Sequence, residues 1–132
     1  MDKNLLPEVS KELFSNLLDI ISDGVWDWNA RTGYVYRNPS WYLMLGYKVE
    51  SFQNTVYTWE SLIHPEDYDR VTTHFDNYIT QKEPAYKIKY RCRTSNGDYL
   101  WIEDKARVVE WEDDGTVGRM IGAHRDISAE QN

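Results

Sequence analysis

The residues of this sequence that could hold a metal or a prosthetic group are three histidines and one cysteine, namely His64, His74, His124 and Cys92. A metal site needs several such ligands at close spacing, and these four are scattered singly along the chain. His64 precedes a proline and fits a helix cap, whereas His74 lies off the apolar stripe of its predicted helix and is expected to face solvent. We therefore predict no metal site, and haem, which an axial histidine commonly binds, is disfavoured.

Paired carboxylates could act as a general acid and a general base. Glu103 and Asp104 are adjacent in a predicted strand, so their side chains point to opposite faces and cannot act together. Glu66 and Asp67 follow a proline, where carboxylates favour the positive end of a helix dipole. The sequence contains no nucleophile motif or phosphate-binding glycine loop, so we predict no catalysis within these residues.

The composition predicts one acidic domain. The chain has 132 residues, with 15 Lys and Arg against 22 Asp and Glu, a net charge of -7 that argues against nucleic acid or an anionic membrane surface as a partner. A single cysteine cannot form an internal disulfide, which fits a reducing compartment. The most apolar early stretch is short and interrupted by Asp19, so neither a signal peptide nor a membrane span is predicted. The expected location is cytoplasmic, although a parent protein could be anchored in a membrane.

The first element that the pattern predicts is an amphipathic helix over residues 8–22. Val9, Leu13, Leu17 and Ile20 form one apolar stripe, and a Ser-Asp-Gly breaker follows. This stripe has too much apolar surface to stand alone. It packs either on its own domain or on a second copy of the chain, and the sequence leaves both open.

Shorter elements fill the middle of the chain. The pattern predicts strands at 25–29 and 34–37, a short helix from Asn38 to Gly46, a helical turn at 59–63 and a longer helix from Pro65 to about Gln81.

The last third reads as three antiparallel strands at 86–93, 99–111 and 117–127. Two turns separate them, at 95–98 and 113–116, and both have the Asn-Gly or Asp-Gly chemistry of a two-residue hairpin that needs positive φ at its two central positions. Such short turns leave no room for crossover helices.

In this order of elements, several short motifs resemble the PAS family of sensory domains. They are Trp26-Asp27-Trp28, Asn38-Pro39-Ser40-Trp41, Met44-Leu45-Gly46-Tyr47, His64-Pro65-Glu66-Asp67, Tyr90-Arg91-Cys92-Arg93, Tyr99-Leu100-Trp101-Ile102 and Asp126-Ile127-Ser128. The resemblance covers roughly residues 20–128. It implies an α+β fold with a five-stranded antiparallel sheet in the order 2-1-5-4-3 and helices over one face. The domain boundaries it suggests are an N-terminal amphipathic helix at 1–22, a PAS domain at 23–128 and the start of a truncated output linker at 129–132.

The resemblance also implies where a small-molecule ligand would bind, between the inner face of the sheet and the helices. The candidate wall residues are Trp26, Trp28, Tyr36, Trp41, Leu45, Leu62, Val71, Phe75, Tyr90, Trp101 and Met120. The alternative is a filled interior, because large aromatic side chains that face each other can close a small core completely. Flavin-photoreceptor relatives carry a reactive cysteine on a helix. Here Cys92 lies on the inward stripe of a strand, so flavin photochemistry is disfavoured and no cofactor is required.

In the family, an Asp-Ile-Ser or Asp-Ile-Thr segment marks the point where the last strand enters an output linker. Asp126, Ile127 and Ser128 match it, so the resemblance implies that Asp126 fixes this signal junction, and Ser128 can cap an outgoing helix.

Three functional hypotheses follow. The first is a sensory module of a larger bacterial signalling protein, a diguanylate cyclase of the GGDEF type or a sensor histidine kinase, with its effector domain in the same chain. The second is a ligand-free homodimerisation module, and the third is a small α+β enzyme, which a convergent set of titratable residues in one pocket would support.

Overall fold

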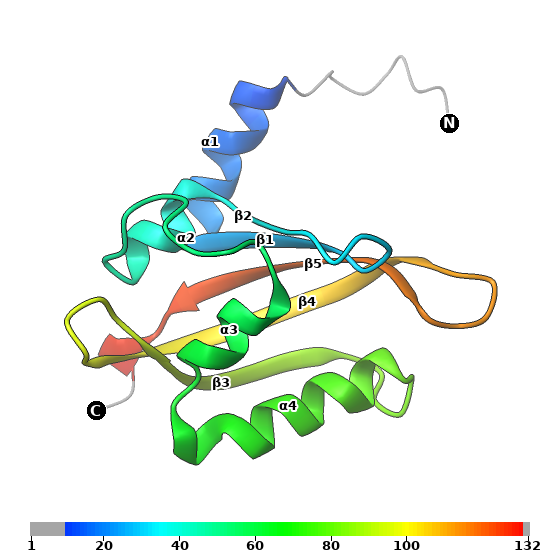
Figure 1. Ribbon diagram of the computed structural model, residues 1–132. Coiled ribbons are helices and arrows are strands. Elements are labelled where there is room, and N and C mark those ends of the chain that lie inside the picture. Colours follow the sequence, from blue (N-terminus) through cyan, green and yellow to red (C-terminus); the bar gives the residue numbers. More distant parts are fainter. Residues whose placement is uncertain (1–9, 131–132) are drawn as a thin grey trace.

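The computed structural model describes residues 10–130 as one antiparallel sheet with helices on one of its faces (Figure 1). The sheet order is β2-β1-β5-β4-β3, as predicted. The elements in chain order are α1 (Lys11–Ile21), β1 (Gly24–Asn29), β2 (Val35–Arg37), α2 (Pro39–Met44), α3 (Val56–Leu62), α4 (Pro65–Ile79), β3 (Tyr86–Arg93), β4 (Tyr99–Trp111), β5 (Val117–Asp126) and the 3₁₀-helix η2 (Ser128–Glu130). The predicted start of the first helix, at residues 8 and 9, and the end of the linker, at 131 and 132, lie outside the described residues.

Helices α2 and α4 begin at residues whose side chains cap their free N–H groups. The Asn38 side chain accepts from the backbone N–H of Trp41 and thereby caps α2, and it also accepts from Val25 of β1. The His64 side chain accepts from the backbone N–H of Glu66, so this histidine caps α4 as predicted. Asn38 thereby joins the start of α2 to β1, and the backbone N–H of His64 joins the start of α4 to β3 by donating to the Arg91 carbonyl.

The two hairpins of the last three strands differ from the predicted turn type. Only Gly97 and Gly115 have positive φ, at 91° and 87°, while Asn96 and Asp114 do not. In each hairpin the glycine N–H donates to a carbonyl three residues earlier, which is a type I turn followed by a left-handed glycine. The prediction of two residues with positive φ was therefore wrong, because a three-residue loop of this kind needs only one.

The core lies between the sheet and helices α2, α3 and α4. Trp41, Tyr42, Tyr86 and Tyr90 are its largest fully buried side chains. Helix α1 is different, because none of its residues is buried and it projects away from the sheet (Figure 1). A hydrogen bond from the Ser40 hydroxyl to the Asp19 carboxylate connects α1 to α2.

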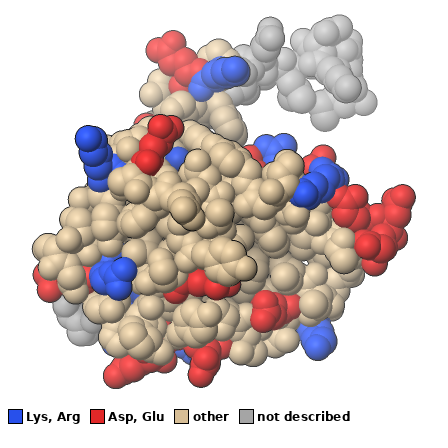
Figure 2. Space-filling model, in the orientation of Figure 1, with Lys and Arg blue, Asp and Glu red and all other residues tan. Residues whose placement is uncertain are grey.

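On the face of the molecule drawn in Figure 2, basic and acidic side chains are interspersed and much of the surface is uncharged. This face therefore carries no continuous basic patch of the kind that binds nucleic acid.

Candidate functional site

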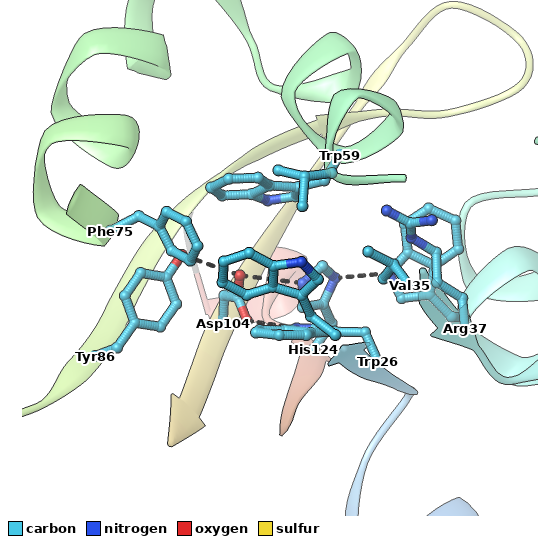
Figure 3. A pocket seen from close by; sticks show the side chains of 11 residues that line it. Trp26, Val35, Arg37, Trp59, Phe75, Tyr86, Asp104 and His124 are labelled. Atoms are coloured by element: carbon cyan, nitrogen blue, oxygen red, sulfur yellow. Dashed lines mark hydrogen bonds and ion pairs between the residues drawn. The ribbon is translucent and has the colours of Figure 1, made fainter. Parts of the chain in front are cut away.

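A small cavity lies between the inner face of the sheet and the helices (Figure 3). Its volume is about 30 Å³, which is room for one or two water molecules. The lining residues come from every strand and from α2, α4 and the α3 region; they are Trp26, Trp28, Val35, Arg37, Trp41, Val56, Trp59, Phe75, Tyr86, Asp104 and His124. The interior is thus nearly filled by aromatic side chains, with three ionisable groups other than tyrosine among them.

Four of the eleven wall residues suggested by the sequence line this cavity: Trp26, Trp28, Trp41 and Phe75. Five more are buried in the surrounding core without lining it: Leu45, Leu62, Val71, Tyr90 and Met120.

The remaining two, Tyr36 and Trp101, lie on the outer face of the sheet. Val35 and Arg37 point inward, so Tyr36 between them points outward and is 45% exposed. Ile102 is likewise buried, which turns Trp101 outward, where the Arg91 guanidinium lies 5.2 Å from its ring centroid. Assigning these two aromatic residues to the cavity was wrong. Successive residues of a strand point to opposite faces of the sheet, so position along the strand, and not residue type, decides which side chains face the cavity.

Asp104 is the polar centre of the cavity. Its carboxylate is 1% exposed and accepts hydrogen bonds from Tyr90 Oη at 2.8 Å, Tyr86 Oη at 3.1 Å and Trp26 Nε1 at 3.1 Å. His124 Nε2 lies 3.2 Å from Oδ2. Burial by itself raises the pKa of Asp104, but the adjacent imidazole and the donated hydrogen bonds more than offset it and hold the pKa below its usual value. Asp104 is therefore a buried carboxylate held in its charged form.

His124 lies directly opposite Asp104 in the pairing of β4 with β5. Trp41 Nε1 donates to His124 Nδ1 at 3.1 Å, so Nδ1 carries no proton in this arrangement and the neutral ring has its proton on Nε2. Nε2 faces Asp104 without the alignment of a hydrogen bond. The imidazole is thus fixed in one tautomer by an indole N–H.

Arg37 is the cationic wall of the cavity, and only 5% of it is exposed. Its Nη2 donates to the backbone carbonyl of Thr55 at 2.8 Å, and its guanidinium lies 5.0 Å from the Trp41 ring centroid. Nη1 is buried and has no hydrogen-bond partner among residues 10–130. Burial lowers the pKa of Arg37, yet guanidinium remains charged at any physiological pH.

Sequence reasoning missed Arg37, Asp104 and His124 as cavity residues. The available signal was the two-residue period of a strand. Arg37 comes two residues after the inward Val35, and Asp104 comes two residues after the inward Ile102, so each shares the inner face. His124 was judged only as a metal ligand. No group of three or more potential metal ligands occurs in the described part of the chain.

The titratable groups that converge here do not form a catalytic set. The Asp104 carboxylate is occupied by three donors and a neighbouring imidazole, and the one free lone pair of His124 is taken by Trp41. No base in this group is free to take a proton from a substrate. The hydrogen bonds of this network join the strands of the sheet to one another and to α2.

The cavity is linked to both ends of the domain through His124. Its backbone carbonyl accepts from the Asp23 N–H at 3.0 Å, and the Asp23 carboxylate accepts from the Asp126 N–H at 2.7 Å. Asp126 Oδ1 in turn accepts from the Ser128 N–H at 2.9 Å. Helix α1 ends just before this cluster and strand β5 ends within it.

The segment after β5 is held to β4. Ile127 is buried and its N–H donates to the Trp101 carbonyl, while Ser128 Oγ accepts from the Trp101 N–H at 3.2 Å. Ser128 therefore uses its hydroxyl on the neighbouring strand, and not as the cap of an outgoing helix, because η2 already begins at this residue.

A sheet of this order, with helices enclosing a small cavity on one face, defines a class of small α+β domains. The model of the PAS fold matches residues 34–124. The chain belongs to the PAS family.

Two solved structures show the likeness at full domain length. A sensory box histidine kinase/response regulator from Burkholderia thailandensis E264 is 29% identical, with a TM-score of 0.76 over 89% of this chain and 86% of that one. The N-terminal domain of a diguanylate cyclase with PAS/PAC sensor from Marinobacter aquaeolei is 31% identical, with a TM-score of 0.70 over 83% of this chain and 98% of that one. The domain is a PAS sensory fold and not a catalytic one.

Among curated proteins, the aryl hydrocarbon receptor nuclear translocator homolog of Drosophila melanogaster matches over 43 residues at 35% identity. That match covers 33% of this chain, which spans only 7% of the relative's length. Within residues 10–130, no helix combines the length and apolar character that crossing a membrane requires.

Proposed function

We propose that this chain is the sensory input module of a larger, cytoplasmic or membrane-anchored bacterial signalling protein. The effector in the same chain is a GGDEF-type diguanylate cyclase or a sensor histidine kinase. The similarity to PAS domains of one protein of each kind supports this proposal. The cavity would bind a small molecule, with neither haem nor flavin required.

The observation that carries the proposal is the short path from the cavity to the ends of the domain. The His124 side chain faces the cavity while its backbone carbonyl holds Asp23, and Asp23 holds the backbone of Asp126. A ligand that favours one position of β5 would also favour one geometry of this junction. The output would then change by a shift between two populations of the domain.

We expect Asp126→Ala to uncouple the effector from the cavity in the longer protein. The input can be changed without knowing the ligand, by Trp59→Phe, which removes the indole N–H that donates to Tyr90. The measurement is effector activity in four proteins: unmodified, each single variant and the double variant. Trp59→Phe should change the output when Asp126 is present and leave it unchanged, within error, in the Asp126→Ala background.

Asp114→Ala is the matched control for this cycle. Asp114 Oδ1 accepts from the backbone N–H two residues later, as Asp126 Oδ1 does, but it lies in the turn between β4 and β5. The response to Trp59→Phe should survive Asp114→Ala. A response that survives Asp126→Ala equally well would show that this junction does not carry the signal.

The second candidate function is homodimerisation, and helix α1 favours it. No residue of α1 is buried, and its apolar stripe is open to solvent: Leu13, Phe14, Leu17, Ile20 and Ile21 are 44–79% exposed. An amphipathic helix whose apolar face is largely exposed among residues 10–130 gains stability by covering that face.

If α1 joins two copies, Leu17→Glu should weaken the dimer by about 100-fold, since each copy then places a charge in the interface. Light scattering after size exclusion over a range of protein concentrations measures this shift. Leu43→Glu, at the 64% exposed leucine of α2, is the control and should leave the dimer intact. A wild-type chain that stays monomeric at every concentration would rule out α1 as a dimer contact.

A further inference from the structure

We propose that Arg37 makes the cavity a site for a small monocarboxylate, whose charged oxygen binds Arg37 Nη1 and whose short apolar body lies against the aromatic walls. This inference rests on the proposed sensory function and names the ligand class of the same cavity.

The first argument is the charge of Arg37. Its guanidinium is buried, and no carboxylate of residues 10–130 lies within 4.0 Å of it. Its only hydrogen-bond acceptor in the described chain is the carbonyl of Thr55, and its guanidinium lies 5.0 Å from the Trp41 ring centroid. A buried cation without a counterion is costly, and a ligand that brings the missing anion removes that cost.

The second argument is that Asp104 does not take this role. Tyr86, Tyr90 and Trp26 already donate to its two oxygens, and His124 lies against it. The Asp104 charge is thus satisfied by hydrogen-bond donors of the chain itself, whereas Arg37 keeps an unused donor at Nη1. The cavity presents a free cationic donor and no free anionic acceptor, which selects an anion.

The third argument is the size and chemistry of the remaining space. The cavity of about 30 Å³ offers about two water-sized positions, and Val35, Val56 and Trp59 are apolar members of its lining. Figure 3 shows Val35 beside Arg37 and Trp59 over the cavity. A second charge on the ligand would have to be buried against these walls without a partner. Formate, with three heavy atoms, comes nearest to this size; acetate and propionate satisfy the charge but need the aromatic walls to move outward, and a dicarboxylate would add an unpaired buried charge.

The experiment is a titration of the full chain with sodium formate, acetate and propionate at constant ionic strength, followed by the indole N–H signals in ¹H–¹⁵N spectra. Trp26 and Trp41 line the cavity and donate from these N–H groups, so their signals report on its interior. Formamide, acetamide and propionamide are neutral probes of matched size, and sodium chloride is the inorganic anion.

We expect saturable shifts of these indole signals with at least one carboxylate, and a dissociation constant at least tenfold higher for its amide. Arg37→Gln should weaken carboxylate binding at least tenfold, whereas Arg93→Gln, at an exposed arginine of β3, should leave it unchanged. If Arg37→Gln does not fold, Arg37→Lys keeps the charge and should still prefer carboxylate over amide.

Equal shifts with carboxylate and amide, equal shifts with chloride, or no saturable shift with any probe would each overturn the proposal. None of these results affects the coupling between Trp59 and Asp126, so the sensory function and the ligand class can fail separately.

Discussion

Asp104→Ala is expected to lower the free energy of unfolding by about 3–5 kcal/mol, because it breaks a buried charged network by removing its common acceptor. Three donors, from Tyr86, Tyr90 and Trp26, would lose their partner in a region that admits one or two waters. The side chain of His124 would lose the adjacent charge as well. Urea unfolding of the wild-type and variant chains, followed by tryptophan fluorescence, measures the difference.

The neighbouring residue supplies the control. Glu103 lies on the other face of β4, where its carboxylate is 3.7 Å from the Arg125 guanidinium, which is itself about half exposed. The Glu103 side chain is 14% exposed, but its single ion pair is long and to a half-exposed partner, so Glu103→Ala should cost only about 1 kcal/mol. If the two alanine variants were equally stable, the Asp104 network would contribute nothing beyond strand propensity.

The contrast between these two adjacent residues also shows what the sequence could predict. Their opposite directions follow from the two-residue period of a strand, which local pattern reveals directly. The same local signals located the glycine turns, the Pro65 start of α4 and the alternation of β3. The fold and its sheet order were predicted from the resemblance of the motifs to the PAS family, and both are confirmed.

The candidate site was harder to predict from the sequence because it is formed by pairing between distant segments. Asp104 meets His124 only because β4 and β5 pair in one register, and Trp41 reaches the same histidine from a helix 83 residues away in the chain. Tyr36 and Trp101 show a second limit of the sequence analysis. They were chosen as wall residues because they are aromatic, although the two-residue period of their strands places them on the outer face. Arg37 was missed because a charged residue in a short strand suggests solvent, and burial emerges only once α3 and the loop at Thr55 cover it.

A second long-range contact, between α4 and β3, gives a pH-dependent prediction. Asp67 is almost fully buried and binds Arg91 three times, accepting from its backbone N–H at 3.0 Å, its Nε at 2.9 Å and its Nη2 at 2.8 Å. The side-chain hydrogen bonds from Arg91 are the main reason that the pKa of Asp67 falls to about 2, although burial opposes the shift. The charged form of Asp67 is therefore the form that stabilises the fold.

The sign of the effect follows from the lowered pKa. Above about pH 5 Asp67 is ionised in both folded and unfolded chains, and its pairing contributes about 2 kcal/mol. As the pH falls from about 4 towards 2, the unfolded chain takes up the proton first, so this contribution is progressively lost. Asp67→Asn should thus destabilise the domain most at pH 5–7, and the difference from wild type should shrink steadily below pH 4.

Urea unfolding at pH 6, 4, 3 and 2.5 measures this convergence, and Asp69→Asn, on the exposed face of α4, controls for general charge effects. That variant should stay within about 0.5 kcal/mol of wild type throughout. The difference between Asp67→Asn and wild type is the informative quantity, because Asp104 also has a lowered pKa and contributes to acid unfolding in both proteins. A destabilisation by Asp67→Asn that is the same at pH 6 and pH 2.5 would mean that shape, and not the charge paired with Arg91, holds α4 to the sheet.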